Sequence, residues 1–113
     1  MADGRTDQAT NHSLECPVVA TARVVSGKWT LLVLRDLAEA PCRFTELERS
    51  LSGISPRTLA QRLTMLEGEG VIEREQFAEM PPRVEYRLTE KGRDLIPLIT
   101  EMRAYGNRWL MDC

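Results

Sequence analysis

The segment ISPRTLAQRLTMLEGEGVIERE, residues 54–75, constrains the fold most, because it joins a well-delimited helix directly to a strand. Ser55 is a favourable N-cap and Pro56 a favourable first-turn residue, so the sequence predicts that a helix begins there. Gly68 and Gly70 are expected to end this helix. The run VIEREQF that follows alternates loosely between apolar and polar residues, which is typical of an exposed strand.

Three helices are predicted upstream of this segment. Pro17 suits the first turn of a helix that continues to Gly27, and KWTLLVLRDLAEA forms a second one that ends before Pro41. Thr45 with Glu48 three residues later is a capping-box pattern, which predicts a short third helix.

Downstream, a turn-rich loop (EMPPR) separates the strand from a second alternating run, VEYRL, which is the expected partner strand. Thr89 is predicted to cap a long final helix that is interrupted near Pro97. The order of elements indicates an α+β, mainly α fold: a winged helix-turn-helix with a two-stranded β-wing and flanking N- and C-terminal helices. Residues 1–13 are expected to be a disordered leader, and residues 14–113 one domain.

Composition sets limits on function. The net charge of −2 shows no overall basicity, so any nucleic-acid binding must come from local placement of arginines. No run approaches the ~18 apolar residues of a membrane span, and the first residues have no apolar core for a signal peptide, so a cytoplasmic protein is expected.

Catalysis and metal binding are not predicted. The cysteines Cys16, Cys42 and Cys113 lack metal-site spacing, and the single histidine, His12, lies in the polar leader. No glycine-rich phosphate loop is present. We therefore expect no enzyme activity, no cofactor and no metal.

The outer face of the predicted helix after Ser55 has the chemistry of a DNA-reading surface. Three leucines, Leu59, Leu63 and Leu66, cluster on one side of the helical wheel. The opposite arc has donors and no carboxylate in its first three turns: Arg57, Gln61 and Thr64, flanked by Thr58 and Arg62. Arg and Gln pair with guanine and adenine edges, although a merely solvated face has the same composition.

The hairpin adds a second candidate contact. Arg83 follows two prolines at the predicted loop tip, where a wing lies against a minor groove or phosphates. Arg43, just before the short third helix, and Ser55, at the start of the predicted DNA-reading helix, are further predicted DNA contacts. The wing strands also contain four glutamates, which argue for a narrow contact surface and a modest salt dependence: Glu73, Glu75, Glu79 and Glu85.

The chain resembles the HxlR-type family of bacterial winged-helix transcriptional regulators, which are relatives of the MarR group. The matching stretches are ECPV, GKWTLLVLRDL, RFTELERSLSGISPRTLAQRLTMLEGEGVIERE and MPPRVEYRLTEKGR, and the resemblance covers about residues 16–109. It implies a dimeric regulator of double-stranded DNA, with the helix from Ser55 as recognition helix and the loop near Arg83 as wing tip. The DNA-reading role that it implies falls on Arg57, Thr58, Gln61 and Arg62.

The final helix is predicted to form the dimer interface. Its apolar stripe runs along Leu98, Met102, Tyr105 and Trp109 and extends beyond where a compact domain of this size should end. We expect a twofold dimer that pairs this helix with the N-terminal helix of the second copy.

Cys16 is a candidate sensor of a small electrophile or oxidant. A thiol at a helix start lies near the positive end of the dipole, which favours the reactive thiolate, and several family members look like thiol sensors in the same Cys-Pro context. An inert, space-filling cysteine is the alternative. Cys42 and Cys113 are weaker candidates.

Two other functions remain open from the sequence. A winged-helix module that binds protein and not DNA fits the acidic wing strands, and a small thiol enzyme acting through Cys16 lacks an ordered histidine partner. The leading hypothesis is a DNA-binding regulator, predicted to be a repressor.

Overall fold

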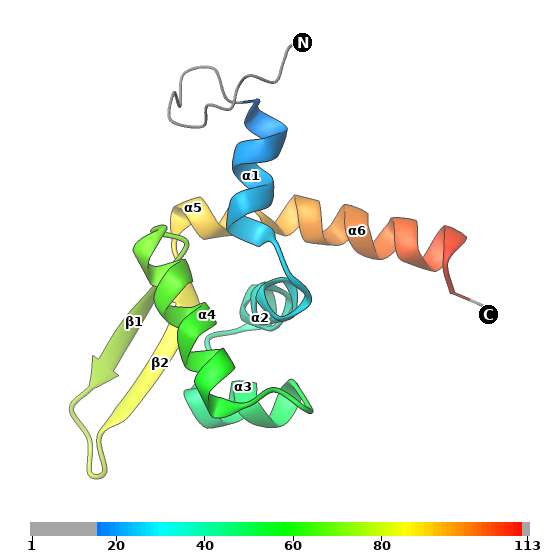
Figure 1. The fold of residues 1–113 in the computed structure, drawn as a ribbon. Coiled ribbons are helices and arrows are strands. Elements are labelled where there is room, and N and C mark those ends of the chain that lie inside the picture. The colour runs from blue at the N-terminus through cyan, green and yellow to red at the C-terminus, as the bar shows by residue number, and fades with distance from the viewer. Residues whose placement is uncertain (1–15, 112–113) are drawn as a thin grey trace.

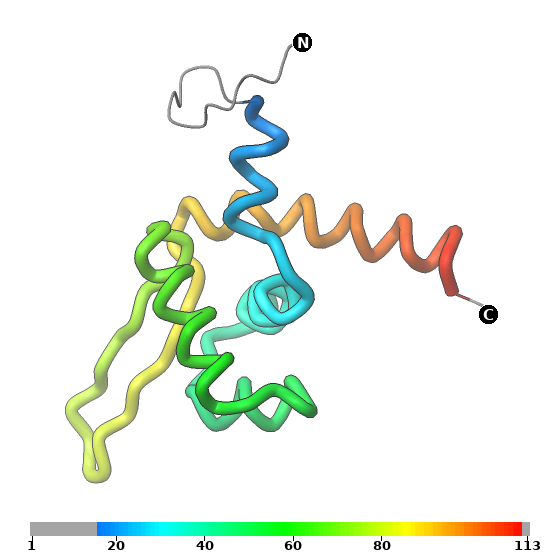
Figure 2. The backbone as a smooth tube through the Cα atoms, viewed as in Figure 1, coloured from blue at the N-terminus to red at the C-terminus, as the bar shows by residue number. Residues whose placement is uncertain are grey.

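The computed structural model describes residues 16–111, and the predicted leader and Cys113 lie outside the described residues. It is mainly helical with one two-stranded antiparallel sheet, which confirms the predicted fold class (Figures 1 and 2). The elements in chain order are α1 (Pro17–Val25), α2 (Lys28–Glu39), α3 (Phe44–Ser50), α4 (Pro56–Gly68), β1 (Ile72–Phe77), β2 (Arg83–Leu88), α5 (Glu90–Arg93) and α6 (Ile96–Trp109).

The core lies where α2, α3, α4 and the sheet meet. The predicted inner face of α4 is buried, with Leu59, Leu63 and Leu66 almost fully excluded from solvent. Burial of each such side chain contributes about 1.5–3 kcal/mol, so this stripe fixes which face of α4 points outward. The other buried apolar residues are Val33, Leu34, Leu37, Leu47, Leu51, Ile54, Val71, Ile72 and Leu88.

The start of α4 is capped as predicted. Ser55 Oγ accepts a hydrogen bond from the Thr58 amide at 3.0 Å, and its hydroxyl donates to Thr58 Oγ1 at 2.9 Å. Pro56 occupies the first helical position, where its missing N–H leaves nothing unpaired. The recognition-helix candidate thus begins at a residue defined by local chemistry.

The predicted capping box of α3 is wrong. The helix begins at Phe44, and the amide of the N-cap residue Arg43 donates to Glu46 Oε1 at 2.7 Å. An arginine side chain has no acceptor, so Glu46 alone caps this end. Phe44 packs against the core from the first position of α3, which places the helix start upstream of Thr45.

The sheet is tied to the helices by a short bridge. Cys42, in the α2–α3 connection, pairs with Tyr86 of β2 through two backbone hydrogen bonds of 3.0 and 2.8 Å. Within the sheet, Ile72 faces Leu88, Glu75 faces Glu85, and Phe77 faces Arg83. The wing, which we define as β1, β2 and the loop 78–82 between them, is therefore anchored at its base and projects beyond the core (Figure 1).

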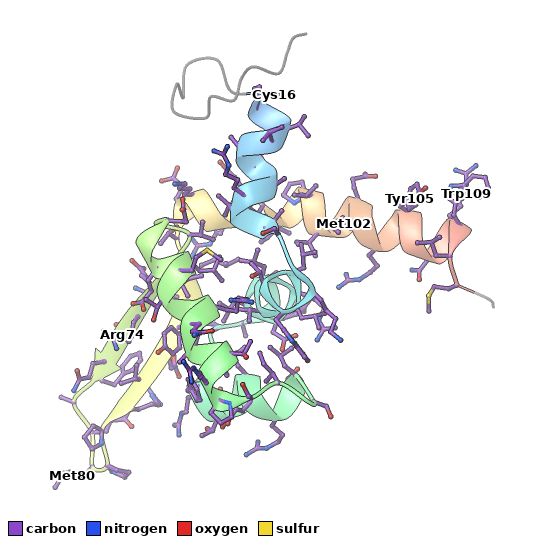
Figure 3. All side chains as sticks on the ribbon, in the orientation of Figure 1. Cys16, Arg74, Met80, Met102, Tyr105 and Trp109 are labelled. Atoms are coloured by element: carbon purple, nitrogen blue, oxygen red, sulfur yellow. The ribbon has the colours of Figure 1, made fainter. Side chains whose placement is uncertain are left out.

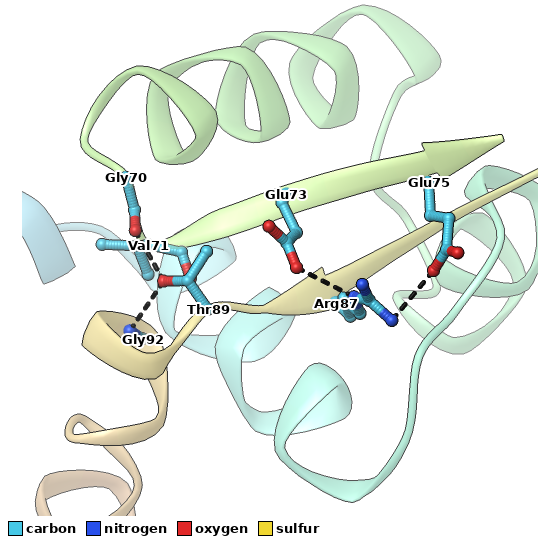
Figure 4. Close-up of polar contacts among 7 residues, drawn as sticks. All are labelled: Gly70, Val71, Glu73, Glu75, Arg87, Thr89 and Gly92. Carbon is cyan, nitrogen blue, oxygen red and sulfur yellow. Dashed lines mark hydrogen bonds and ion pairs between the residues drawn. The ribbon is translucent and has the colours of Figure 1, made fainter.

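Thr89 caps α5, a short helix that the sequence did not separate from the final one. Its hydroxyl donates to the Gly70 carbonyl at 2.6 Å and accepts from the Gly92 amide at 3.1 Å (Figure 4). Gly92 lies so close to Val71, the residue before β1, that an added Cβ would overlap the Val71 carbonyl oxygen. The chain then turns at residues 94–95, so the predicted interruption near Pro97 is confirmed, with Pro97 in the first turn of α6.

The two flanking helices project away from this body (Figure 1). Neither α1 nor α6 contains a fully buried residue. Within residues 16–111, no helix is long and apolar enough by itself to cross a membrane, and only α1 and α2 taken together, bent by 83°, reach such a length.

Candidate nucleic-acid interface

The outer face of α4 presents the side chains that the sequence singled out. Ser55, Arg57 and Gln61 are exposed, while Thr58 and Arg62 are half-buried on the flanks of the same helix. The first carboxylate along α4 is Glu67, in its last turn, where Arg74 of β1 lies 3.7 Å away. The exposed face of the first three turns thus offers only hydrogen-bond donors, amides and hydroxyls.

The arginines around α3 and α4 are electrostatically available. Among residues 16–111, Arg43, Arg49, Arg57 and Arg62 form neither an ion pair nor a side-chain hydrogen bond. Arg49, exposed in the last turn of α3, was not predicted, because a basic residue at a helix C-terminus has an ordinary local explanation. Arg43 precedes α3 beside Cys42, so it lies near the wing and not on the face of α4.

The wing arginines Arg83 and Arg87, by contrast, are paired with glutamates. Arg87 bridges Glu73 at 2.9 Å and Glu75 at 2.8 Å (Figure 4). Arg83 lies 3.2 Å from Glu79 and 3.5 Å from Glu85. These pairs neutralise the guanidinium groups of the wing before any ligand is bound.

Arg83 is the first residue of β2, and not a loop-tip residue as the sequence suggested. Its guanidinium lies 4.2 Å from the centroid of the Phe77 ring, and its side chain is only 27% exposed. The cross-strand register places Phe77 directly opposite Arg83, and this register cannot be read from the sequence. Met80, 96% exposed, occupies the projecting end of the wing instead (Figure 3).

The two described cysteines differ in environment. Cys16 is the exposed N-cap residue of α1, with its carbonyl accepting from the Ala20 amide at 2.9 Å and its thiol making no capping bond. Cys42 is half-buried, and its Sγ–H donates to the Ala40 carbonyl at 3.4 Å. Burial, followed by the charges of Asp36, Glu46 and Glu85, raises the pKa of the Cys42 thiol, which disfavours its thiolate.

The far halves of α1 and α6 expose apolar side chains. On α6, Tyr105 is 61% and Trp109 64% exposed, next to exposed Met102, while Leu98 is half-buried (Figure 3). Val18 and Val19 of α1 are exposed as well, which the sequence did not single out. No group of three or more histidine, cysteine or acidic side chains in the described range is arranged to hold a metal ion.

Comparison with protein families identifies residues 24–113 as a match to the HxlR-like helix-turn-helix model. An uncharacterised HTH-type transcriptional regulator from Synechocystis sp. is 41% identical over 95 residues, which cover 84% of this chain and 70% of that protein.

Solved structures show the same similarity. The redox regulator HypR in its oxidised form matches with a TM-score of 0.80 at 37% identity, covering 87% of this chain and all of that one. The transcriptional regulator YodB from Bacillus subtilis, in its reduced form, matches with a TM-score of 0.74 at 34% identity, covering 86% of this chain and 96% of that one.

Proposed function

This chain belongs to the HxlR-like helix-turn-helix family, whose members are transcriptional regulators, and from that premise we propose that it represses transcription as a homodimer on a pseudo-palindromic operator. The observation that supports this proposal best is the exposed outer face of α4, with unpaired Arg57 and Gln61 and no carboxylate in its first three turns. Such side chains lose no internal partner when they enter a major groove.

The proposed DNA contacts divide by chemistry. Arg57 and Gln61 are suited to base edges, where one good bidentate contact discriminates by about 1–3 kcal/mol. Ser55, Thr58 and Arg62, near the start and flank of α4, are suited to phosphates, as are the unpaired arginines Arg43 and Arg49. The positive end of the α4 dipole also favours phosphate.

Homodimer formation rests on the apolar surfaces of α1 and α6. Val18 and Val19 on α1, and Met102, Tyr105 and Trp109 on α6, are exposed apolar side chains on helices that have no buried residue in one copy. Pairing two copies through these helices removes these side chains from water. A twofold dimer presents two α4 helices at a spacing of about 34 Å, which is one turn of DNA.

Regulation by a small electrophile or oxidant is proposed to act through Cys16. The thiol is exposed at the start of α1, a helix that we place in the dimer interface, so its modification changes the interface that spaces the two α4 helices. Similarity to HypR and YodB, which are described in reduced and oxidised or reagent-treated forms, supports this assignment. The target, chromosomal DNA, implies a cytoplasmic protein.

The test is fluorescence anisotropy of the reduced protein on the intergenic DNA beside its own gene, with excess random duplex at fixed salt. We expect competitor-resistant binding that diamide weakens, and a Cys16→Ser protein whose binding diamide leaves unchanged. Binding no tighter than to random duplex would contradict the operator. A Cys16→Ser protein that responds like the wild type would contradict the sensor.

A second function is favoured by one observation, the acidic excess on the wing, which suits a basic protein partner. Under that alternative, charge reversal at Arg57 would leave the interaction intact.

A further inference from the structure

The side chains of one face of the wing form two groups of ion pairs, one around Arg87 and one around Arg83. We call this face the outer wing face, and it consists of Glu73, Glu75, Phe77, Arg83, Glu85 and Arg87, joined by Glu79 from the loop. The other face of the sheet holds Ile72 and Leu88 in the core. Each of the two arginines of the outer wing face contacts two glutamates, so no cation on this face is available to a phosphate.

This face contains more negative charge than the fold requires. Glu75 and Glu85 are directly opposite each other in the register, a like-charge pair that destabilises a hairpin. Arg87 and Arg83 compensate from either side, but the face still has two more carboxylates than guanidinium groups. A hairpin selected only for stability would place opposite charges at facing positions of the two strands.

The contrast with the helices indicates a role in recognition. Arg43, Arg49, Arg57 and Arg62, on or next to α3 and α4, are unpaired, whereas the wing arginines Arg74, Arg83 and Arg87 are each paired with a glutamate. Sequence-independent binding to DNA depends on the number of phosphates that cations neutralise. Building on the proposed DNA-binding function, we propose that the four wing glutamates are specificity determinants, which keep Arg83 and Arg87 from phosphates and so suppress binding to random DNA.

Among the wing cations, Arg83 is the one that its neighbours restrain most. It is held by Phe77 beneath its guanidinium and by Glu79 and Glu85 at its nitrogens. Its Nε is buried and makes no hydrogen bond, because the approach of Glu85 at 3.5 Å is an ion-pair contact only. Any phosphate must displace these carboxylates, which favours contact by the wing only where α4 already positions the DNA.

The experiment measures the affinity of the full chain for random duplex by anisotropy as a function of salt. The variant is Glu79→Gln/Glu85→Gln, which releases Arg83. The control is Glu39→Gln/Glu90→Gln, which changes the net charge equally at exposed carboxylates that make no ion pair within the described residues. We expect the wing variant to bind random duplex roughly fivefold tighter than the control, which is the size of one charge pair at ~4 Å in water. Its slope of log K against log salt should steepen by about 0.9.

A third variant, Glu79→Gln/Glu85→Gln/Arg83→Gln, separates release of Arg83 from a general loss of repulsion, and it should lose most of the gain. Equal affinities for the wing variant and the control, in proteins with unchanged thermal unfolding, would overturn the proposal and favour a protein-binding role for this face. A gain that persists without Arg83 would also overturn it. These outcomes differ from a failure of the proposed DNA-binding function. In that case the wild-type protein itself would bind intergenic DNA no tighter than random duplex.

Discussion

At the scale of single residues, the fold depends on a few positions where adding or removing one side-chain atom would disturb the packing or a hydrogen bond. Gly92 is required because α5 lies so close to Val71, the residue before β1, that a Cβ would meet the Val71 carbonyl oxygen and the Leu88 side chain of β2. Thr89 fixes the same junction from the other side through its hydroxyl. Together these residues set where the wing ends and the path to α6 begins.

Replacing Gly92 by alanine should therefore destabilise the protein by about 1–3 kcal/mol, the usual cost of overpacking. The measurement is urea unfolding followed by circular dichroism. Gly68→Ala is the matched control, since a Cβ there has nothing within 4 Å. Equal stabilities of the two variants would contradict the close approach.

The environment of Cys42 gives a pH-dependent prediction. Its thiol pKa is raised above the ordinary 9.0 by burial and by Asp36, Glu46 and Glu85, so the folded protein favours the protonated form. The stability contributed by the protonated Cys42 thiol is present below pH 9 and is lost as the pH rises through the pKa of the folded protein. Alkylation of Cys42 by iodoacetamide should accordingly be slow at pH 8 and rise only at higher pH than in the urea-unfolded chain. Mass spectrometry of the modified peptides measures this, and identical pH profiles would contradict it.

At the scale of the elements, the sequence predicted α4 well because its signals are local. Ser55, Pro56 and the leucine spacing lie within one helix, so no distant contact was needed. The start of α3 was missed because Phe44 is held by the core, which is a tertiary effect. The ion pairs of Arg83 were missed because the register across the hairpin decides which side chains meet.

The cap of α4 is open to a direct test. Ser55→Ala removes the acceptor of the Thr58 amide and should lower the free energy of unfolding by about 1 kcal/mol. Ser52→Ala, at an exposed turn position outside any helix, should leave it nearly unchanged. Equal effects of the two substitutions on urea unfolding would show that the cap contributes nothing.

At the scale of the whole molecule, the shape places the proposed DNA-binding surface and the proposed dimer surface on different sides of the core (Figure 1). The α3–α4 unit and the wing lie on one side of the core, while the free halves of α1 and α6 project from the other (Figure 1). The sequence indicated both surfaces from residue type alone. It placed the N-terminal helix in the dimer but did not single out the exposed Val18 and Val19, because a short apolar run is equally typical of a buried helix.

The dimer proposal predicts that Trp109→Ser weakens self-association at least tenfold, because it removes the largest apolar side chain of the exposed surface of α6. Asn107→Ser, an exposed polar position on the same helix, is the control. Sedimentation velocity across a concentration series measures both. A wild-type protein that is monomeric at micromolar concentration would contradict the dimer.

Whether the outer face of α4 reads DNA is tested by comparing Arg57→Ala with Arg93→Ala by anisotropy on the intergenic duplex with random competitor. Arg93 is an exposed arginine of α5 without an ion pair among residues 16–111, so both variants lose one charge. We expect Arg57→Ala to weaken specific binding by about 1–3 kcal/mol and Arg93→Ala to change it little. Equal affinities for the two variants would contradict the assignment of α4 as the recognition helix.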